Sequence, residues 1–303
     1  MFSDEAKART YFEGVHWPNG PFCPHCGETE KVYRLNGKSH RPGLVHCNSC
    51  HEAFTVTVGT VMERSHIPLT KWALGFRLMA ASKKGVSAHQ LHRTLGITYK
   101  AAWFMAHRIR EAMDPGTSGG PIGGPDKIVE ADETFLSNSP KTKKHPGSGG
   151  YAHKRAVLGL VERGGRVRSV KLEGPPNRYE IRKAIKAHVD PATTLHTDGA
   201  QFYRFLPEVA KHETVDHSKG EYARGNVHTN TAEGYFSVFK RGMIGVYQHC
   251  GDQHLHRYLA EFDFRQSNRI ALGVNDDVRT ARAVKGAVGK RLTYHQVSGP
   301  EAS

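Results

Sequence analysis

The feature that most constrains the fold of this chain is a pair of C-x-x-C motifs, Cys23-Pro-His-Cys26 and Cys47-Asn-Ser-Cys50, separated by 20 residues. A C-x-x-C turn places two thiolates on one side of a metal ion, so two such turns supply the four ligands of a tetrahedral zinc ion. A closed shell of four thiolates indicates a structural metal. We therefore expect residues 1–66 to form a zinc ribbon. Its short strands are expected at 31–34, 44–46 and 54–58.

Two alternatives stay open for these cysteines. The first is disulfide bonding. The first ten residues contain no apolar core of an export signal, which favours the cytosol, and disulfides are rare in proteins that remain there. The second is metal ligation by neighbouring histidines, which four cysteines make unnecessary. These histidines are His25, His46 and His51. Cys250 stands alone in the sequence and is expected to be a buried or incidental thiol.

Composition narrows the class of partner. The chain has 303 residues, with 43 Lys and Arg against 29 Asp and Glu, which gives a formal charge of +14. The basic clusters are spread along the sequence, as suits a long polyanion, although solvated helix faces without a partner are the alternative. No apolar run reaches the roughly 20 residues that a membrane helix needs. We therefore expect a cytoplasmic protein of about two domains with no membrane partner.

A helical segment, residues 67–113, follows the ribbon. Apolar residues recur there with the period of a helix, and Ser87 begins a second helix through a capping box with Gln90. Gly96 turns the chain, and Thr98 starts a third helix. Helix, glycine turn and helix form the outline of a DNA-binding helix-turn-helix, although a plain helical connector has the same outline. The residues expected to face a DNA groove are Tyr99, Lys100, His107 and Arg108.

The second half of the chain has a different pattern. Glycine and proline dominate residues 114–126, which we expect to be a linker. Residues 127–273 alternate strand and helix character, which predicts a mixed α/β domain. Residues 274–303 are expected to be a basic C-terminal tail, loosely ordered from about Ala281. Strands are expected at 127–135, 156–162, 167–172, 194–198 and 213–217, helices at 177–188 and from 229 onward, and a lysine- and glycine-rich loop at 139–151.

Three acids of this domain stand where a metal could be held. Asp132 and Asp198 are expected near the ends of two strands, and Glu233 near the start of a helix. Converging carboxylates can hold two Mg²⁺ ions roughly 3.5–4 Å apart, an arrangement used for phosphodiester chemistry. Lys240 follows Glu233 by seven residues, so it shares a helix face with Glu233 and could reach a phosphate. Solvated turn residues are the alternative for acids at strand ends.

Other polar residues lie close to these acids in the sequence. Glu130 is expected on the same strand face as Asp132, where it could support that residue, and Glu133 is the acid that follows it. His196 and His228 precede candidate ligands by two and five residues. We expect each histidine either to contact the site or a phosphate, or to be a hydrogen-bonded structural residue. The aromatic residues expected in the core are Tyr235, Phe236 and Phe239.

Six segments, together with the C-x-x-C motifs, carry a resemblance to a known family between about Pro21 and Arg269. They are Val129-Glu-Ala-Asp-Glu-Thr134, His196-Thr-Asp-Gly199, His228-Thr-Asn-Thr-Ala-Glu-Gly234, Phe239-Lys-Arg-Gly242, Gly245-Val-Tyr247 and the run from His254 to Asn268. The chain resembles bacterial insertion-sequence transposases that have an N-terminal zinc ribbon and a DDE catalytic domain and are related to the eukaryotic Merlin elements.

The resemblance implies a ribonuclease H-like catalytic fold and DNA transposition with Mg²⁺ or Mn²⁺, held by Asp132, Asp198 and Glu233. Some relatives use Asn as the third ligand, so Asn230 is the alternative to Glu233. The implied partner is double-stranded DNA, both transposon ends and target, bound by a homodimer or larger assembly at the nucleoid. Two other functions stay open: a DNA-binding regulator that does not cut, and a ribonuclease H-like nuclease that does not transpose.

Overall fold

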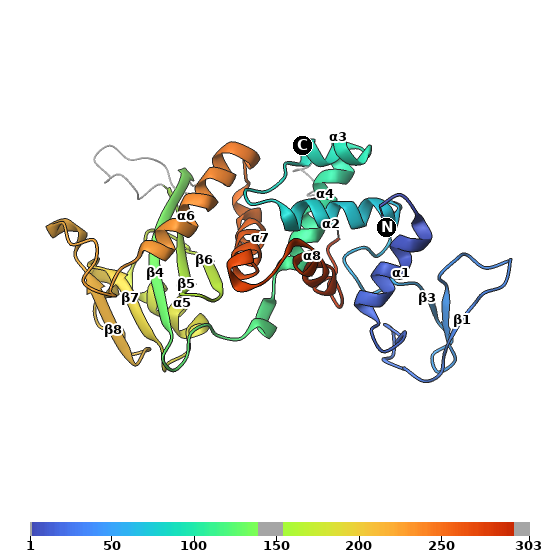
Figure 1. The fold of residues 1–303 in the computed structure, drawn as a ribbon, viewed down its shortest axis with the longest axis horizontal. Helices are drawn as coiled ribbons and strands as arrows, with labels where there is room; N and C mark the ends of the chain where they lie inside the picture. The colour runs from blue at the N-terminus through green and yellow to red at the C-terminus, as the bar shows by residue number, and fades with distance from the viewer. Residues whose placement is uncertain (1, 139–153, 294–303) are drawn as a thin grey trace, which may run out of the picture. The chain divides into compact units, whose positions relative to one another are not determined.

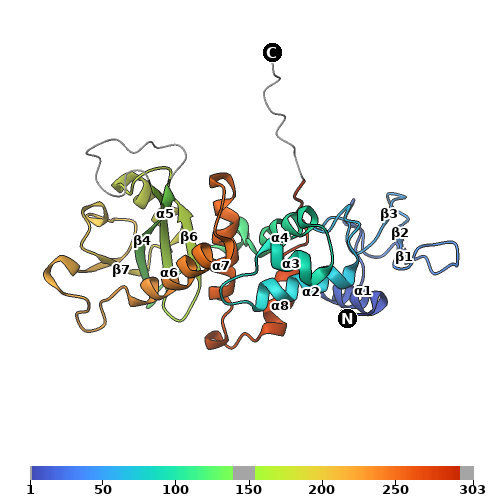
Figure 2. The ribbon, with the colours of Figure 1, turned by 90° about the horizontal axis from the view of Figure 1, so that it is seen from above.

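The computed structural model describes residues 2–138 and 154–293, so the loop expected at 139–151 lies outside the described residues. The described residues form two compact units, which Figures 1 and 2 show in two views. The first unit comprises residues 2–82, 86–113 and 276–293, and the second comprises residues 83–85 and 114–275. In the part of the chain that is described, no helix has both the length and the apolar character to cross a membrane.

The first unit begins with helix α1 (Glu5–His16), which lies outside the elements expected from the sequence. A three-stranded antiparallel sheet follows, in the order β1, β2, β3. Its strands are β1 (Val32–Arg34), β2 (Val45–Cys47) and β3 (Ala53–Phe54). The strands expected at 31–34 and 44–46 are confirmed. The strand expected at 54–58 ends at Phe54, because the chain turns there and the Val58 amide donates to the Thr55 carbonyl at 3.0 Å.

The rest of the first unit is helical. It consists of α2 (Leu69–Ala81), α3 (Ala88–Leu95), α4 (Tyr99–Met113) and α8 (Asp276–Lys285). The Ser87 hydroxyl accepts from the Gln90 amide at 3.1 Å and caps α3. Gly96 ends α3 with a φ of 57°, a left-handed conformation that suits glycine. The Thr98 hydroxyl accepts from the Ala101 amide at 3.2 Å at the start of α4. These three helix boundaries are confirmed.

Helix α4 does not present the surface expected of it. His107 and Arg108 are buried, with 1% and 9% of their surface exposed. The guanidinium of Arg108 lies 4.5 Å from the ring centre of Phe104 and donates to the Glu63 carbonyl at 3.1 Å. Three helices, α2, α3 and α8, pack against α4, and from Ala101 onward every residue of α4 is at least half-buried. Of the four residues expected to face DNA, those exposed are Tyr99 and Lys100, at its N-terminal end.

The expectation of a loosely ordered C-terminal tail is wrong for the described part of that segment. Helix α8 packs against α1, α2 and α4. Arg279 of α8 is buried and donates to the Ala80 carbonyl at 3.3 Å, which ties α8 to the end of α2. Ala283, Val284 and Ala287 are fully buried in the same unit. Residues 276–293 therefore complete the first unit, and residues 294–303 lie outside the described residues.

The second unit is built on a five-stranded mixed sheet in the order β6-β5-β4-β7-β8. Its strands are β4 (Ile128–Asn138), β5 (Lys154–Glu162), β6 (Val167–Lys171), β7 (Thr194–Asp198) and β8 (Lys211–Val215). The first three pair antiparallel, as the glycine turn between β5 and β6 predicts, and β7 and β8 join parallel to β4. This is the strand order of the ribonuclease H-like fold. The strand expected at 213–217 begins two residues earlier and ends at Val215.

Helices cover both faces of this sheet. Helix α5 (Arg178–His188) packs on one face, over Val129, Ala131 and Leu195. Helix α6 (Asn230–Gly242) packs on the other, where Tyr235, Phe236 and Phe239 are buried as expected. α7 (Leu255–Ser267) continues that layer. Successive strand residues alternate between the two layers, so odd-numbered residues of β4 face α5 and even-numbered ones face α6. The even-numbered face of β4 carries Glu130 and Asp132.

Candidate active site

The two candidate acids of the sheet lie side by side. Strands β4 and β7 are parallel, and their last paired residues are Glu130 and His196. Two residues further along each strand, on the same face, stand Asp132 and Asp198. β7 ends at Asp198, as expected, whereas β4 continues to Asn138, so Asp132 lies in the middle of its strand and not at its end. The pairing of β4 with β7 alone thus brings two carboxylates together from positions 66 residues apart.

A glycine lets helix α6 approach the sheet at this level. Gly159 of β5 is the cross-strand partner of Asp132. A Cβ atom added at Gly159 would stand 2.6 Å from the ring of Phe236 on α6, closer than real side chains pack. The absence of a side chain there allows Phe236 to lie directly against β5. The helix that carries Glu233 and Lys240 is therefore held close to the strand that carries Asp132.

The pKa of Asp132 is shifted first by burial and then by the charges around it. Burial, and after it the charge of Asp198, raises this pKa from 3.8 to about 6. The charge of Glu233 also raises it, and that of Lys240 lowers it, so both residues of α6 act on Asp132 electrostatically. Oxygen ligands that repel one another are the donor set that a hard divalent cation neutralises. The residues present therefore fit Mg²⁺ or Mn²⁺.

Within the described residues, the three candidate acids are not gathered as closely as the four cysteines are. Glu233, Asn230 and Lys240 are all exposed on α6. Asn230 is the first residue of the helix and Glu233 the fourth, so they lie nearly one turn apart. Among the described His, Cys, Asp and Glu side chains, the four cysteines are the group of three or more whose ligand atoms all lie within 4.8 Å of one another. Two acids of the sheet and one of α6 therefore share this region without a formed cation cage.

Glu133 is a fourth acid at this site, for which the sequence pattern indicates no role. It belongs to the odd-numbered face of β4, and the hydroxyl of the buried Tyr203 donates to its carboxylate at 2.9 Å. Burial, followed by the charges of Asp198 and Asp132, raises the pKa of Glu133 from 4.5 to about 7. The position of Glu133 directly after Asp132 could have indicated that it lies near the site. Strand alternation places its side chain on the opposite face of β4, so the sequence alone does not predict its electrostatic interaction with Asp132.

His196 and His228 are hydrogen-bonded to the same residue, Arg163, which the sequence does not single out. The guanidinium donates to Nδ1 of His228 at 2.9 Å and approaches Nδ1 of His196 at 3.2 Å. Burial and the nearby charge of Arg163 lower the pKa of His196, so its ring is neutral and can accept. Of the two expectations for these histidines, the structure gives the hydrogen-bonded structural role.

The C-terminal end of α6 is anchored to α7. After α6 the chain makes one π-helical turn that ends at Tyr247, whose hydroxyl donates to Glu261 at 2.5 Å. Glu261 is fully buried and also pairs with Arg265, one turn along α7. Most of the segment from His254 to Asn268 is buried, including Tyr258 and Phe262, which belong to the apolar cluster under α6. This sequence signature therefore serves to pack the helix that carries Glu233.

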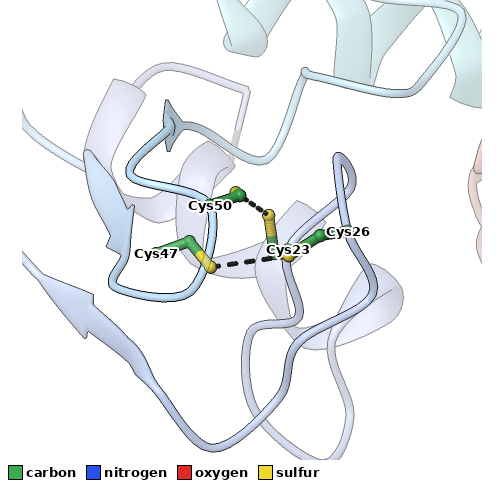
Figure 3. A group of neighbouring side chains, drawn as sticks. All are labelled: Cys23, Cys26, Cys47 and Cys50. Carbon is green, nitrogen blue, oxygen red and sulfur yellow. Dashed lines mark hydrogen bonds between the residues drawn. The ribbon is translucent and has the colours of Figure 1, made fainter.

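The four expected zinc ligands converge in the first unit, as Figure 3 shows. Sγ of Cys23 lies 3.6 Å from that of Cys50, and Sγ of Cys26 lies 3.7 Å from that of Cys47. Four sulfurs bound to a tetrahedral zinc at about 2.3 Å stand about 3.8 Å apart, so the spacing fits this ion. The cysteines are free, which rules out disulfides, and no histidine belongs to the group among the described residues. Cys250 is buried.

Two family models match the chain: a transposase zinc-ribbon domain over residues 3–53 and an ISXO2-like transposase domain over residues 122–267. A Halobacterium salinarum protein, described as an uncharacterized protein in transposable element ISH50, is 29% identical over 280 residues, 88% of this chain and 92% of that protein. Among solved structures, a pre-cleavage Mos1 transpososome aligns with TM-score 0.27 and 9% identity over 70% of this chain and 74% of that one. A Mos1 strand transfer complex aligns with TM-score 0.22 and 11% identity over 66% and 77%.

Proposed function

This chain belongs to the transposases that combine a zinc-ribbon domain with an ISXO2-like transposase domain, and on that premise we propose how its residues carry out DNA transposition. The second unit would cut and join DNA strands, and the ribbon and helices of the first would bind the terminal inverted repeats. One observation carries the proposal: Asp132 and Asp198 stand at the same level of two parallel strands, on the face that packs against the helix of Glu233 and Lys240.

The kind of metal proposed for each site follows from its donor atoms, sulfur in one and carboxylate oxygen in the other. Zinc held by the four cysteines would be structural, since no coordination position remains for a substrate. Asp132 and Asp198 would hold Mg²⁺ or Mn²⁺ from the sheet, and Glu233 would complete the ligand set from α6. Glu233 is favoured over Asn230 because a carboxylate contributes negative charge to the cations. When bound, these cations would lower the pKa of the attacking hydroxyl and neutralise charge on the leaving oxygen.

The reaction consists of two displacements at phosphorus. In the first, a water oxygen bonds to the phosphorus at the transposon end, and the bond to the 3′ oxygen breaks, leaving a 3′-hydroxyl. In the second, this hydroxyl bonds to a phosphorus of the target DNA, and the target's 3′ oxygen leaves. Neither step needs a covalent bond to the enzyme. Lys240 would hold the scissile phosphate through its ammonium group, since it is exposed on α6 and its charge reaches Asp132.

The proposed partners are double-stranded transposon ends and target DNA. The net charge of +14 would contribute salt-dependent contacts to DNA phosphates. Joining two ends calls for at least two copies of the chain, so we propose a homodimer or larger assembly on DNA, acting at the nucleoid in the cytoplasm. The domain assignment that goes with this function is a zinc ribbon at 1–66, a DNA-binding helical segment at 67–113, a linker at 114–126 and a catalytic domain at 127–273.

A nicking assay on the DNA that flanks the gene tests this function. We expect Mg²⁺-dependent cleavage at the element's ends, and we expect Asp132→Asn and Asp198→Asn each to reduce its rate by at least about a thousandfold, as the loss of several kcal/mol of transition-state stabilisation implies. Binding to end DNA should persist in both variants. The matched control is Glu208→Gln, an acid of the same unit paired with Arg182.

Three results would count against the proposal. Cleavage retained in Asp132→Asn would remove this residue from the catalytic set. End binding without any cleavage by the wild-type chain would favour a DNA-binding regulator. Equal cleavage of unrelated duplexes or RNA–DNA hybrids, without preference for the ends, would favour a nuclease of the same fold.

A further inference from the structure

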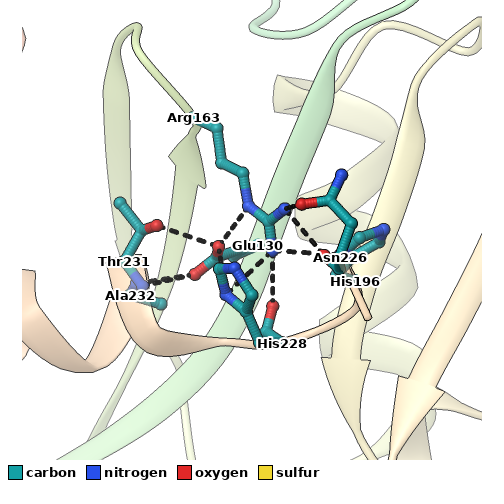
Figure 4. Close-up of polar contacts among 7 residues, drawn as sticks. All are labelled: Glu130, Arg163, His196, Asn226, His228, Thr231 and Ala232. Atoms are coloured by element: carbon teal, nitrogen blue, oxygen red, sulfur yellow. Dashed lines mark hydrogen bonds and ion pairs between the residues drawn. The ribbon is translucent and has the colours of Figure 1, made fainter. Parts of the chain in front are cut away.

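A buried carboxylate, Glu130, lies beside the candidate acids. It precedes Asp132 by two residues on the same face of β4, and its side chain is fully buried. A carboxylate has about four acceptor positions, and Glu130 uses four, as Figure 4 shows. One oxygen accepts from the amides of Thr231 and Ala232 at 2.7 and 3.0 Å. The other accepts from the Thr231 hydroxyl at 2.9 Å and from Nε of Arg163 at 2.5 Å.

These bonds cap helix α6 from a different strand. Thr231 and Ala232 are the second and third residues of α6, and their amides have no acceptor within the helix. An N-cap side chain normally accepts from such amides, but Thr229, the N-cap of α6, makes no side-chain bond of this kind. The carboxylate of Glu130 takes that place, and its negative charge suits the positive end of the helix dipole. The start of α6 is thereby fixed to β4.

Arg163 fixes the segment that leads into α6. Its guanidinium donates to the carbonyl and the side-chain oxygen of Asn226, both at 2.8 Å, and to the carbonyl of His228 at 3.0 Å. The same group reaches Nδ1 of His196 on β7, at 3.2 Å. His196 is the residue of β7 that pairs with Glu130. One ion pair therefore connects β4, β7 and the start of α6, the three elements that carry the candidate acids.

Each of these elements contributes a network residue that lies one or two positions before an acid. The pairs are Glu130 and Asp132, His196 and Asp198, and Ala232 and Glu233. We propose that Glu130 and Arg163 are positioning residues that fix the three acids, and with them Lys240, relative to one another. The contacts stand independently of any activity, whereas the effect on cleavage rests on the proposed function.

The ion pair of Glu130 with Arg163 can counteract the repulsion among the acids of the site. Asp132, Asp198 and Glu233 repel one another, so without a constraint the helix would tend to move away from the strands. The ion pair of Glu130 with Arg163 has no net charge, and it therefore ties helix to sheet without adding to that repulsion. Because Glu130 is buried and all four of its acceptor positions are used, even a conservative substitution would leave a buried donor without its acceptor.

The variant Glu130→Gln tests the proposal, because Gln has one acceptor oxygen and places an amide donor against the donors of α6 or Arg163. We expect hydrogen exchange of the amides in the first turn of α6 to accelerate by about 10- to 100-fold, as the loss of a buried acceptor implies. Exchange in the antiparallel strands β5 and β6 should not change. We further expect the Mg²⁺ concentration for half-maximal cleavage to rise by about tenfold or more, with end-DNA binding unchanged.

Two other variants keep this test decisive. Glu208→Gln removes the partner of Arg182, whose Nε lies 2.6 Å from the Glu208 carboxylate, and should alter neither readout. Thr231→Val removes one of the four bonds to Glu130 at nearly constant volume, so it reports on the cap if Glu130→Gln does not fold. Thr231→Val should show the same changes as Glu130→Gln in both readouts, but smaller. Unchanged exchange of α6 in both Glu130→Gln and Thr231→Val would overturn the proposal.

A double variant separates positioning from general destabilisation. Because Glu130 ties α6 to the sheet, part of its effect passes through Glu233, so Glu130→Gln should lower cleavage less in a Glu233→Gln background than in the wild type. Full additivity of the two losses would overturn the positioning role. The exchange measurement needs no DNA and no metal. A chain that shows the cap by exchange but never cleaves DNA would therefore contradict the proposed function while leaving the cap in place.

Discussion

The two candidate metal-ligand sets of this chain are built in opposite ways. The four cysteines lie in two short turns, and their sulfurs already stand 3.6 and 3.7 Å apart in facing pairs, the spacing of a tetrahedral zinc shell. The three acids come from a strand, a second strand and a helix, and the pKa of Asp132 is raised by burial and by the charge of Asp198. Local turns bring the first set together, whereas the packing of a whole domain brings the second together.

This difference indicates that the four cysteines stabilise the fold around them, whereas the three acids depend on the fold to hold them together. The ribbon sheet has only eight residues in its three strands, too few to form a sizeable core, so a metal held by the four cysteines would be part of its structure. The second unit has two apolar clusters, one on each face of its sheet, and can hold acids that repel one another. Removing a ligand should therefore destabilise the first site and stabilise the second in the absence of metal.

The largest expected effect is the loss of the ribbon in Cys47→Ser. Structural zinc contributes on the order of 10 kcal/mol to small zinc domains, and three remaining ligands hold the ion much more weakly. We expect this variant to lose its zinc on dialysis and amides of the ribbon strands to exchange freely. Metal analysis and peptide-resolved hydrogen exchange measure both. The matched control is Cys250→Ser, a buried cysteine of the second unit, which should retain the full zinc content.

The next largest expected effect is on the cleavage rate, and it distinguishes Glu233 from Asn230 as the third ligand. We expect Glu233→Gln to reduce cleavage by about a hundredfold or more, because the ligand set loses one negative charge beside the cations. Asn230→Ala should retain activity within about threefold, since Asn230 would lie outside the ligand set. Single-turnover cleavage at saturating Mg²⁺ separates the two variants. The opposite order, with Asn230→Ala the more severe, would assign the ligand role to Asn230.

The smallest expected effect is on the stability of the metal-free second unit. Its sign is opposite to that of Cys47→Ser, because removing an acid should stabilise this unit. The folded chain binds a proton on Asp132 more tightly than the unfolded chain, with a pKa of about 6 against 3.8, so stability present below the lower value is lost as the pH rises through the higher one. Glu133 acts in the same direction, with a pKa of about 7 against 4.5. The metal-free second unit should therefore lose stability between about pH 4 and pH 7.

Asp132→Asn removes part of this loss. At pH 7 and without divalent metal, we expect this variant to be more stable than the wild type by about 1–2 kcal/mol, allowing for partial exposure of the side chain. The pH dependence of its stability should also be weaker. Urea unfolding at several pH values measures both quantities. A metal-free Asp132→Asn that is less stable than the wild type at pH 7 would contradict the cost of holding this buried charge beside Asp198, on which the comparison depends.

Much of this molecule follows from local patterns in the sequence. The convergence of the four cysteines, the helix boundaries at Ser87 and Gly96 and the common face of Glu130 and Asp132 all follow from spacing and periodicity, and the structure confirms them. Each depends on residues within one or two turns or on strand alternation, both of which the sequence shows directly. The packing of Tyr235, Phe236 and Phe239 follows from the same rule.

What the sequence did not show depends on contacts between distant segments. His107 and Arg108 look like the polar face of an amphipathic helix, but α8 returns from residue 276 and covers α4 together with α2 and α3. Periodicity indicates one buried face and cannot indicate a second neighbour that begins only at residue 276. Arg163 is similar, because its importance comes from acceptor atoms of residues 130, 196, 226 and 228, which the fold places around it.

The most direct test of the central claim, that the acids form a cation site supported by the fold, is anomalous diffraction from crystals of the full chain soaked in Mn²⁺. We predict zinc at the four cysteines and Mn²⁺ between Asp132 and Asp198, with the Glu233 side chain completing its ligands from α6. Mn²⁺ bound elsewhere, with the pair of aspartates free of metal, would contradict the account.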